Sequence, residues 1–300
     1  MERKGKADYI FMETAKTIIP AALSFVFKPF IDKSVWQKKH PYPFYANYGS
    51  SGIGCTINRS ILVSATKYPK NRILFNGKDC SFPTVQTALK YLTPETVIIN
   101  IDSQLPLGWG FGVSGASALG ALYCANRLLN LKIADSKLAE MAHAAEIREK
   151  TGLGTVATLI NGGCLVKIKP GLPSLFRKLN LRGRKIYAIL IGPIATKSIL
   201  ESNDKMEKIS RQAEIILNRI NSLSNITLEK IMDESFIFVR ENNLLTAKTL
   251  SLIRKIHKLG GRATMNILGE VVLSTIALPL IKLRQEELII TDQTARIFYD

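Results

Sequence analysis

Short apolar runs in the first third of the chain predict β-strands. Residues 53–65 (IGCTINRSILVSA) alternate weakly and are rich in β-branched side chains, whereas 72–75 and 97–101 are short apolar runs. Residues 81–92, which lie between the last two runs, have the spacing of a helix. We therefore expect strands and a helix before residue 105.

Helical periods dominate the next fifty residues. Residues 114–130 carry small and apolar side chains around nearly the whole circumference, which predicts a helix buried on most sides. Asp135 is expected to cap a second helix over 136–149. This second helix has one apolar face, formed by Leu138, Met141, Ala142 and Ala145.

The second half mixes strands and helices again. A strand over 164–168 is followed by Pro170 and Gly171, where the pattern breaks. We therefore divide the chain into an N-terminal domain, residues 1–168, and a C-terminal domain, residues 169–300. Beyond the boundary the pattern predicts a strand, three helices and a final segment that contains a strand, at 185–192, 204–223, 226–241, 244–259 and 286–298.

The chain is strongly basic, with a formal net charge of +17 at pH 7. Nucleic acid, an anionic membrane surface or small phosphorylated molecules could each explain such a charge. The basic residues are spread along the whole length among acidic ones, without a zinc finger, an RNP-like strand or a long basic arm. We therefore expect anionic small molecules as partners and neither nucleic acid nor membrane, and a homodimer stays open.

The cysteines and the N-terminal residues indicate the cellular compartment of the protein. The four cysteines show no CxxC or Cys/His metal spacing, which favours reduced thiols and a cytoplasmic protein. Residues 18–27 resemble the apolar part of a signal peptide, but Pro20 interrupts them. Four lysines follow in place of a small-residue cleavage site: Lys28, Lys33, Lys38 and Lys39. We read this segment as part of the mature protein.

A glycine-rich run, PLGWGFGVSGASALGA at 106–121, passes directly into the predicted helix. Three glycines let the backbone take positive φ and approach a ligand closely: Gly108, Gly110 and Gly112. Ser114 and Ser117 add hydroxyls near the first free N–H groups of the helix, whose positive end favours a polyphosphate. The run predicts a phosphate-binding loop. It is not a Walker A loop, because the Lys-Ser/Thr pair is missing.

A transmembrane helix is the main alternative for this region. Residues 105–126 contain no charged side chain, and a GxxxG step lies inside the stretch. Pro106 and the three glycines would disrupt the first turns of such a helix. A phosphate loop that leads into a buried helix agrees better with the pattern.

Three sequence blocks together resemble a known family. They are the glycine-rich run, AHAAEIREKTGLGTVATLINGGCLVKIKPG at 142–171 and ATMNILGE at 263–270. In this order the blocks resemble the GHMP kinase superfamily, and within it the archaeal pantoate kinase-like branch. The resemblance implies an α+β, two-lobed GHMP kinase fold. Its N-terminal domain is of the ribosomal S5 domain 2-like type, its C-terminal domain is α+β, and ATP binds in the cleft between them.

The resemblance also implies roles for particular residues. Gly110 and Gly112 fall on the phosphate-binding glycines of the family. We expect ATP to be bound by Pro106, Gly108, Gly110, Gly112, Val113, Ser114, Gly115 and Ser117. Ser114 and Glu146 fall on the magnesium-contacting serine and on the helix glutamate that completes the metal site, which suits a cation that prefers oxygen ligands. The alternatives are an ordinary helix N-cap for Ser114 and a solvated carboxylate for Glu146.

Two departures from the family pattern affect the expected chemistry. Thr155 stands where many of these kinases have an aspartate that acts as general base, and a threonine cannot take a proton near neutral pH. The usual N-terminal motif is replaced by a segment rich in lysine and aromatic residues. We expect catalysis from Ser114, Glu146 and Thr155. Substrate contacts are expected from Lys28, Lys33, Gly154 and Thr155.

The resemblance and its departures predict an ATP-dependent kinase that phosphorylates a primary hydroxyl of a branched hydroxy acid. We favour mevalonate 3-phosphate, converted to the 3,5-bisphosphate in isoprenoid biosynthesis, with pantoate in coenzyme A biosynthesis as the alternative. The additional phosphate would then be neutralised by Lys28, Lys33, Lys38, Lys39 or Arg59. A catalytically degenerate nucleotide-binding protein is the alternative of another class, since Thr155 replaces the base. Phosphoryl transfer stays feasible without a general base, because the transition state of this reaction is loose and catalysis depends mainly on positioning.

Overall fold

Two β-sheets organise the chain in the computed structural model, which describes residues 13–31, 34–38, 40–194, 200 and 202–297. The larger sheet is built on two long antiparallel strands, β1 (Thr14–Phe30) and β2 (Gly49–Lys67). Its strand order is β12-β1-β2-β5-β3-β4, while β6 pairs with β2 and β7 pairs with β6. The remaining strands of this sheet are β3 (Arg72–Phe75), β4 (Lys78–Asp79), β5 (Val97–Ser103), β6 (Cys164–Lys167), β7 (Phe176–Leu179) and β12 (Arg296–Ile297).

Strand β1 contains the apolar run that superficially resembles a signal peptide. Its middle is buried, and the pairing register with β2 shifts between Pro20 and Ala21 and again between Ser24 and Val26. A proline has no N–H group to donate to a neighbouring strand, and sheets tolerate it mainly at irregular positions. Pro20 lies at such a position, a register shift. The sequence pattern did not predict this strand, because a continuous apolar run shows no period-2 alternation.

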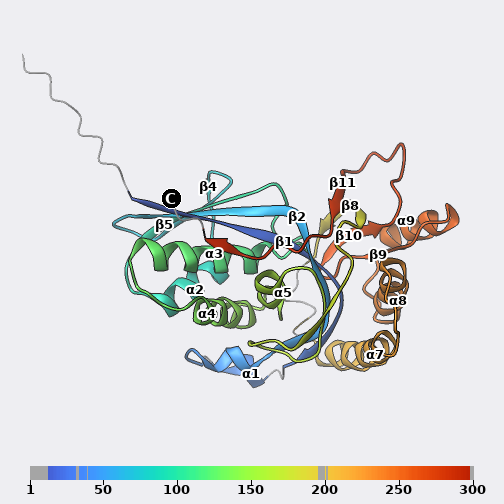
Figure 1. Ribbon diagram of the computed structural model, residues 1–300, viewed down its shortest axis with the longest axis horizontal. Coiled ribbons are helices and arrows are strands. Elements are labelled where there is room, and N and C mark those ends of the chain that lie inside the picture. The colour runs from blue at the N-terminus through green and yellow to red at the C-terminus, as the bar shows by residue number, and fades with distance from the viewer. Residues whose placement is uncertain (1–12, 32–33, 39, 195–199, 201, 298–300) are drawn as a thin grey trace, which may run out of the picture.

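Four helices lie on one face of the larger sheet (Figure 1). They are α2 (Pro83–Leu92), α3 (Val113–Leu128), α4 (Asp135–Arg148) and α5 (Thr155–Asn161). Helix α3 packs against β1 and β2 and is buried on most sides, as predicted. A Cβ at Gly120 would lie 2.6 Å from Cγ2 of Val63, so small residues let α3 approach the sheet closely. Asp135 is the first residue of α4 and not its cap, because the N-cap position is Ala134.

The smaller sheet has the order β11-β8-β10-β9. Its strands are β8 (Lys185–Pro193), β9 (Ala263–Met265), β10 (Gly269–Ser274) and β11 (Gln285–Ile289). It packs with helices α8 (Leu228–Glu241) and α9 (Ala247–Lys258), while α7 (Asn203–Asn221) contacts β1 and α8 (Figure 1). The α+β class is therefore confirmed. Gly260 follows α9 with φ +82°, as expected of a residue after a helix C-cap.

Strand pairing crosses the predicted domain boundary. Strand β7 extends the larger sheet through β6, and β12 pairs with β1 although it lies near the C-terminus. The short helices α1 (Ser34–Gln37) and η1 (Phe44–Asn47) lie between β1 and β2 in the chain. The division at residues 168 and 169 stays a prediction.

No helix in the part of the chain that the structure describes is long and apolar enough to cross a membrane. The glycines at 108–112 lie outside α3, whose 16 residues begin at Val113. The transmembrane interpretation of 105–126 is therefore wrong.

Candidate active site

A cavity of about 410 Å³ brings together the sequence blocks at 106–121 and 142–171 and parts of both sheets. Its size is within the range of small-molecule and cofactor sites. Residues from the segments 24–27, 50–53, 81–84, 107–115 and 146–155 border it. The remaining lining residues are Lys167 of β6, Ile194 directly after β8, and Ile267 and Leu268 of the β9–β10 turn.

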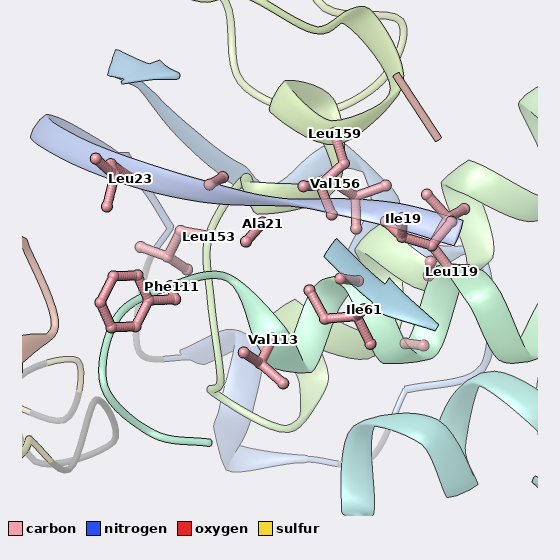
Figure 2. Close-up of a cluster of buried hydrophobic side chains, with 14 of the residues drawn as sticks. Ile19, Ala21, Leu23, Ile61, Phe111, Val113, Leu119, Leu153, Val156 and Leu159 are labelled. Atoms are coloured by element: carbon pink, nitrogen blue, oxygen red, sulfur yellow. The ribbon is translucent and has the colours of Figure 1, made fainter. Parts of the chain in front are cut away.

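The glycine loop takes the conformation that the sequence predicts. Gly108, Gly110 and Gly112 have φ of +83°, +80° and +72°, a region that side chains rarely adopt. Phe111 between them is 1% exposed, and its carbonyl accepts a hydrogen bond from the N–H of Ala22 at 3.0 Å. Figure 2 shows Phe111 in a cluster with side chains of β1, α3 and α5. The loop is thus anchored in the core while its glycines border the cavity.

Helix α3 begins with its N-terminus at this cavity. Gly112 is its N-cap, so the alternative in which Ser114 is an ordinary N-cap is wrong. Val113, Ser114 and Gly115 all border the cavity. Two of the predicted nucleotide residues do not border the cavity. One is Ser117, which is buried, and its hydroxyl has no hydrogen-bond partner among the described residues. Pro106 is also outside the lining.

Glu146 lies near the end of α4 and is 1% exposed, so the alternative of a solvated carboxylate is wrong. The N–H of Val156 donates to its Oε2 at 3.3 Å. Burial raises the pKa of Glu146 to about 7, and hydrogen bonds from Thr155 and Val156 and the charge of Lys167 oppose the rise. A carboxylate with this pKa ionises near neutral pH, which is typical of a functional site.

Two glycines make room for this carboxylate. A Cβ at Gly115 would lie 2.6 Å from Oε1 of Glu146, and a Cβ at Gly152 would lie 2.4 Å from the same atom. Oε1 is therefore next to the first turn of α3, one residue after Ser114. A hydroxyl and a carboxylate are oxygen donors that suit Mg²⁺, which usually takes its other ligands from water and substrate phosphates. The pair fits a site in which ATP supplies the remaining ligands.

Thr155 begins α5 and borders the cavity beside Gly154. Its hydroxyl hydrogen-bonds to Glu146, and its methyl carbon Cγ2 would lie 2.7 Å from a Cβ at Gly112. Thr155 is therefore placed between the carboxylate and the glycine loop. A hydroxyl in this position can orient Glu146, but it cannot act as the general base.

Lys167, at the end of β6, is a cavity residue that the sequence analysis missed. It is 8% exposed, and its Nζ donates to the carbonyl of Gly154 at 2.8 Å. Burial lowers the pKa of Lys167 to about 8, and the charge of Glu146 opposes that change. The available signal was a lysine at the end of an otherwise apolar strand, CLVK. Buried lysines are rare unless they are paired or functional.

His143 lies beside Glu146, and its Nδ1 has no hydrogen-bond partner among the described residues. It is fully buried, which lowers its pKa to about 4, so the ring is neutral. Its Nε2 lies 2.8 Å from the carbonyl of Tyr48, which can only accept, so Nε2 carries the proton. Nδ1 is then an unprotonated acceptor, 4.0 Å from Oε2 of Glu146.

The lysines that the sequence analysis assigned to substrate are elsewhere or undescribed. Lys28 pairs with Glu214 of α7 at 3.2 Å and does not border the cavity. Lys38 is exposed and borders a separate groove, and Arg59 pairs with Glu286 at 3.1 Å. Lys33 and Lys39 lie outside the described residues.

Comparisons with known proteins agree with this geometry. The family profile described as "GHMP kinases N terminal domain" matches residues 83–163. A pantoate kinase of Methanocaldococcus jannaschii is 30% identical over 226 residues, which cover 74% of this chain and 81% of that protein. A pantoate kinase of Methanospirillum hungatei is 27% identical over 230 residues, which cover 74% and 76%.

Solved structures share the fold. A "phosphotransferase related to CoA biosynthesis pathway" superposes with a TM-score of 0.81 at 20% identity and covers 95% of this chain and 99% of its own. A mevalonate-3-kinase of Thermoplasma acidophilum superposes with a TM-score of 0.63 at 12% identity and covers 95% and 99%. At these identities the likeness concerns the two-lobed fold alone.

Proposed function

Since this chain belongs to the GHMP kinase family and is a phosphotransferase, we propose that it transfers the γ-phosphoryl group of ATP to the primary hydroxyl of pantoate. The observation that carries the proposal is the 30% identity to a pantoate kinase across 81% of that relative. A third relative, from Thermococcus kodakarensis and also named pantoate kinase, is 26% identical over 272 residues. The earlier preference for mevalonate 3-phosphate has no such support.

The charge available in the cavity also favours pantoate. Among the described residues, the cations that border the cavity are Lys150 and Lys167. Lys150 lies over the ring of Trp36 at 5.0 Å, next to Glu149, whereas Lys167 lies beside Gly154 and Thr155. One buried ammonium group matches the single carboxylate of pantoate. Mevalonate 3-phosphate would add a phosphate, for which this side of the cavity offers no second described cation.

The apolar wall near Lys167 suits a branched acid. Val26 and Ile53 are paired across β1 and β2, and Phe27 is the next residue of β1. All three border the cavity, and Gly52 is the β2 partner of both Phe27 and Lys167. In the proposed complex these side chains contact the two methyl groups of pantoate while Lys167 binds its carboxylate.

The proposed mechanism depends on positioning more than on proton transfer. The amides of the glycine loop and the N-terminus of α3 bind the phosphates, and Ser114 and Glu146 hold Mg²⁺. When bound, Mg²⁺ neutralises the charge on the transferring phosphoryl group. The acceptor hydroxyl oxygen attacks the γ-phosphorus and the bond to the leaving ADP breaks. The hydroxyl proton passes late in the step to an oxygen of the transferred phosphoryl group and from there to water, so Thr155 need not take it.

A panel assay tests the proposal. ADP release is measured with ATP, Mg²⁺ and each of pantoate, mevalonate, mevalonate 3-phosphate, homoserine and shikimate. We expect the highest kcat/KM with pantoate, and phosphorus NMR of the product to show phosphate on the primary hydroxyl. A higher kcat/KM with mevalonate 3-phosphate would overturn the assignment.

ADP release in this assay needs a control that excludes contaminating kinases. The Ser114→Ala variant should lose well over tenfold in turnover with the same acceptor, because it lacks one proposed metal ligand. Nucleotide binding without ADP release for any acceptor would favour the degenerate alternative.

A further inference from the structure

The turn between β9 and β10 lies beside two parts of the cavity. Asn266 in this turn is fully buried. Its N–H donates to the carbonyl of Val271 at 2.8 Å, and its carbonyl accepts from the N–H of Gly269 at 3.2 Å. The backbone of the turn is thus closed on itself, and the side-chain amide of Asn266 is left for contacts outside the turn.

The amide oxygen of Asn266 binds strand β1. Its Oδ1 accepts from the N–H of Ser24 at 3.0 Å, and the N–H of Ile267 donates to the carbonyl of Ser24 at 3.0 Å. Both backbone groups of Ser24 are therefore held by the turn. This is the place where the pairing of β1 with β2 shifts register, between Ser24 and Val26. Ser24 and Val26 border the cavity at its proposed acceptor end.

The amide nitrogen of the same side chain faces the glycine loop. Nδ2 of Asn266 donates to the carbonyl of Trp109 at 3.5 Å. The backbones are in close contact here, because a Cβ at Gly269 would lie 1.9 Å from the Trp109 carbonyl oxygen. A Cβ at Gly110 would lie 2.8 Å from the carbonyl of Ile267 and 2.9 Å from Nδ2 of Asn266.

We infer that Asn266 is a positioning residue that fixes the glycine loop and the acceptor strand relative to each other. One planar amide supplies both an acceptor and a donor, so a single side chain sets the distance between Ser24 and Trp109. Phosphoryl transfer depends on such alignment, and small misplacements reduce rates strongly. The inference rests on the proposed function, because it assigns the nucleotide to the loop and the acceptor to β1.

Two substitutions separate the two contacts. Asn266→Asp keeps an oxygen for the N–H of Ser24 but places a second carboxylate oxygen opposite the carbonyl of Trp109. Asn266→Leu removes both contacts and keeps the branched shape of the side chain, although leucine is larger. We expect Asn266→Asp to raise the KM for ATP and lower kcat by about tenfold or more, with the KM for pantoate changed less than about threefold. Asn266→Leu should raise both KM values.

A matched control is available at another buried asparagine. Asn242 is 6% exposed, and its Nδ2 donates to Phe238 of its own helix at 2.8 Å. Asn242→Asp should lower thermal stability without changing either KM. If Asn266→Leu does not fold, Asn266→Ser replaces it in the comparison with Asn266→Asp. Serine is smaller than asparagine and is too short to make both contacts.

Nucleotide affinity without any acceptor keeps this inference separate from the proposed function. The dissociation constant of a fluorescent, non-hydrolysable ATP analogue is measured for wild type and variants. Weaker binding by Asn266→Asp, by about tenfold, supports the inference even if pantoate is not the acceptor. Unchanged affinity and unchanged kcat per folded molecule, with only a lower Tm, would overturn it and leave Asn266 as a structural residue.

Discussion

The two ends of the cavity are built in different ways. The proposed nucleotide end comes mainly from one contiguous segment, 107–115, and its recognition groups are backbone amides at a helix N-terminus. The proposed acceptor end combines β1, β2 and β6, and Lys167 of β6 is more than a hundred positions from the contributing residues of β1 and β2. Recognition of the nucleotide by backbone amides can be predicted from the sequence, because it requires a pattern of glycines. Recognition of the acceptor by side chains can be seen only in the structure, after the strands are paired.

The largest effect should come from the acceptor end, at Lys167. Lys167→Met removes the buried ammonium at similar volume, and kcat/KM for pantoate should fall by at least about 100-fold, since a paired buried charge is lost. The KM for ATP should change little. Steady-state kinetics with both substrates varied check this, and equal losses for ATP and pantoate would contradict the division of the cavity.

The same variant should gain stability as it loses activity. The pKa of Lys167 is about 8 in the folded protein and about 10.4 for an unfolded lysine, so the unfolded state binds this proton more tightly. Lys167→Met should therefore be more stable than wild type by about 1–3 kcal/mol at pH 7. The difference should shrink as pH rises from about 8 to about 10. Urea unfolding at pH 7 and pH 10 measures it.

At the nucleotide end, Glu146→Gln should lower turnover by well over tenfold, because a neutral amide binds Mg²⁺ poorly. The wild-type pKa of about 7 adds a pH dependence: kcat/KM should fall as pH decreases below 7, because Glu146 becomes protonated. More Mg²⁺ should shift that midpoint to lower pH, since the metal favours the ionised form. A midpoint that does not respond to Mg²⁺ would argue against metal contact.

Between the two ends, Thr155→Val should have a smaller effect. It removes the hydroxyl that hydrogen-bonds to Glu146 and keeps the methyl group near Gly112. We expect a loss of about three- to tenfold in kcat, against less than about threefold for Thr155→Ser, since the lost hydrogen bond contributes about 1 kcal/mol. A loss of 1000-fold for Thr155→Val would mean that the hydroxyl takes part in proton transfer.

The smallest effect should be that of Lys28→Ala. Lys28 and Glu214 form a partly exposed pair outside the cavity lining, with side-chain exposures of 21% and 58%. Surface pairs of this kind contribute about 0–1 kcal/mol to stability. Both KM values should stay within about twofold of wild type in steady-state assays. A large rise in the KM for the acceptor would restore the substrate role first expected for Lys28.

The predictable parts of the molecule are those that local sequence determines. Strand β3 is a short apolar run, helix α3 is a long run of small and apolar residues, and the glycine loop shows its own conformational requirement. Lys167 and Asn266 escaped prediction because their contacts with Gly154 and Ser24 join different elements and form only in the folded chain. Glu146 was found only through resemblance, since nothing in its own helix indicates that Gly115 and Gly152 leave space for its carboxylate.

The pairing of β12 with β1 has a consequence for synthesis of the chain on the ribosome. Thr17 and Ile297 are register partners, and the N–H of Ala295 donates to the carbonyl of Leu159 at 2.9 Å. Protein domains usually fold in order as they emerge during translation. Here the edge of the larger sheet beside β1 remains open until residues 296 and 297 have been made, so the nascent N-terminal half cannot complete that edge before these residues emerge.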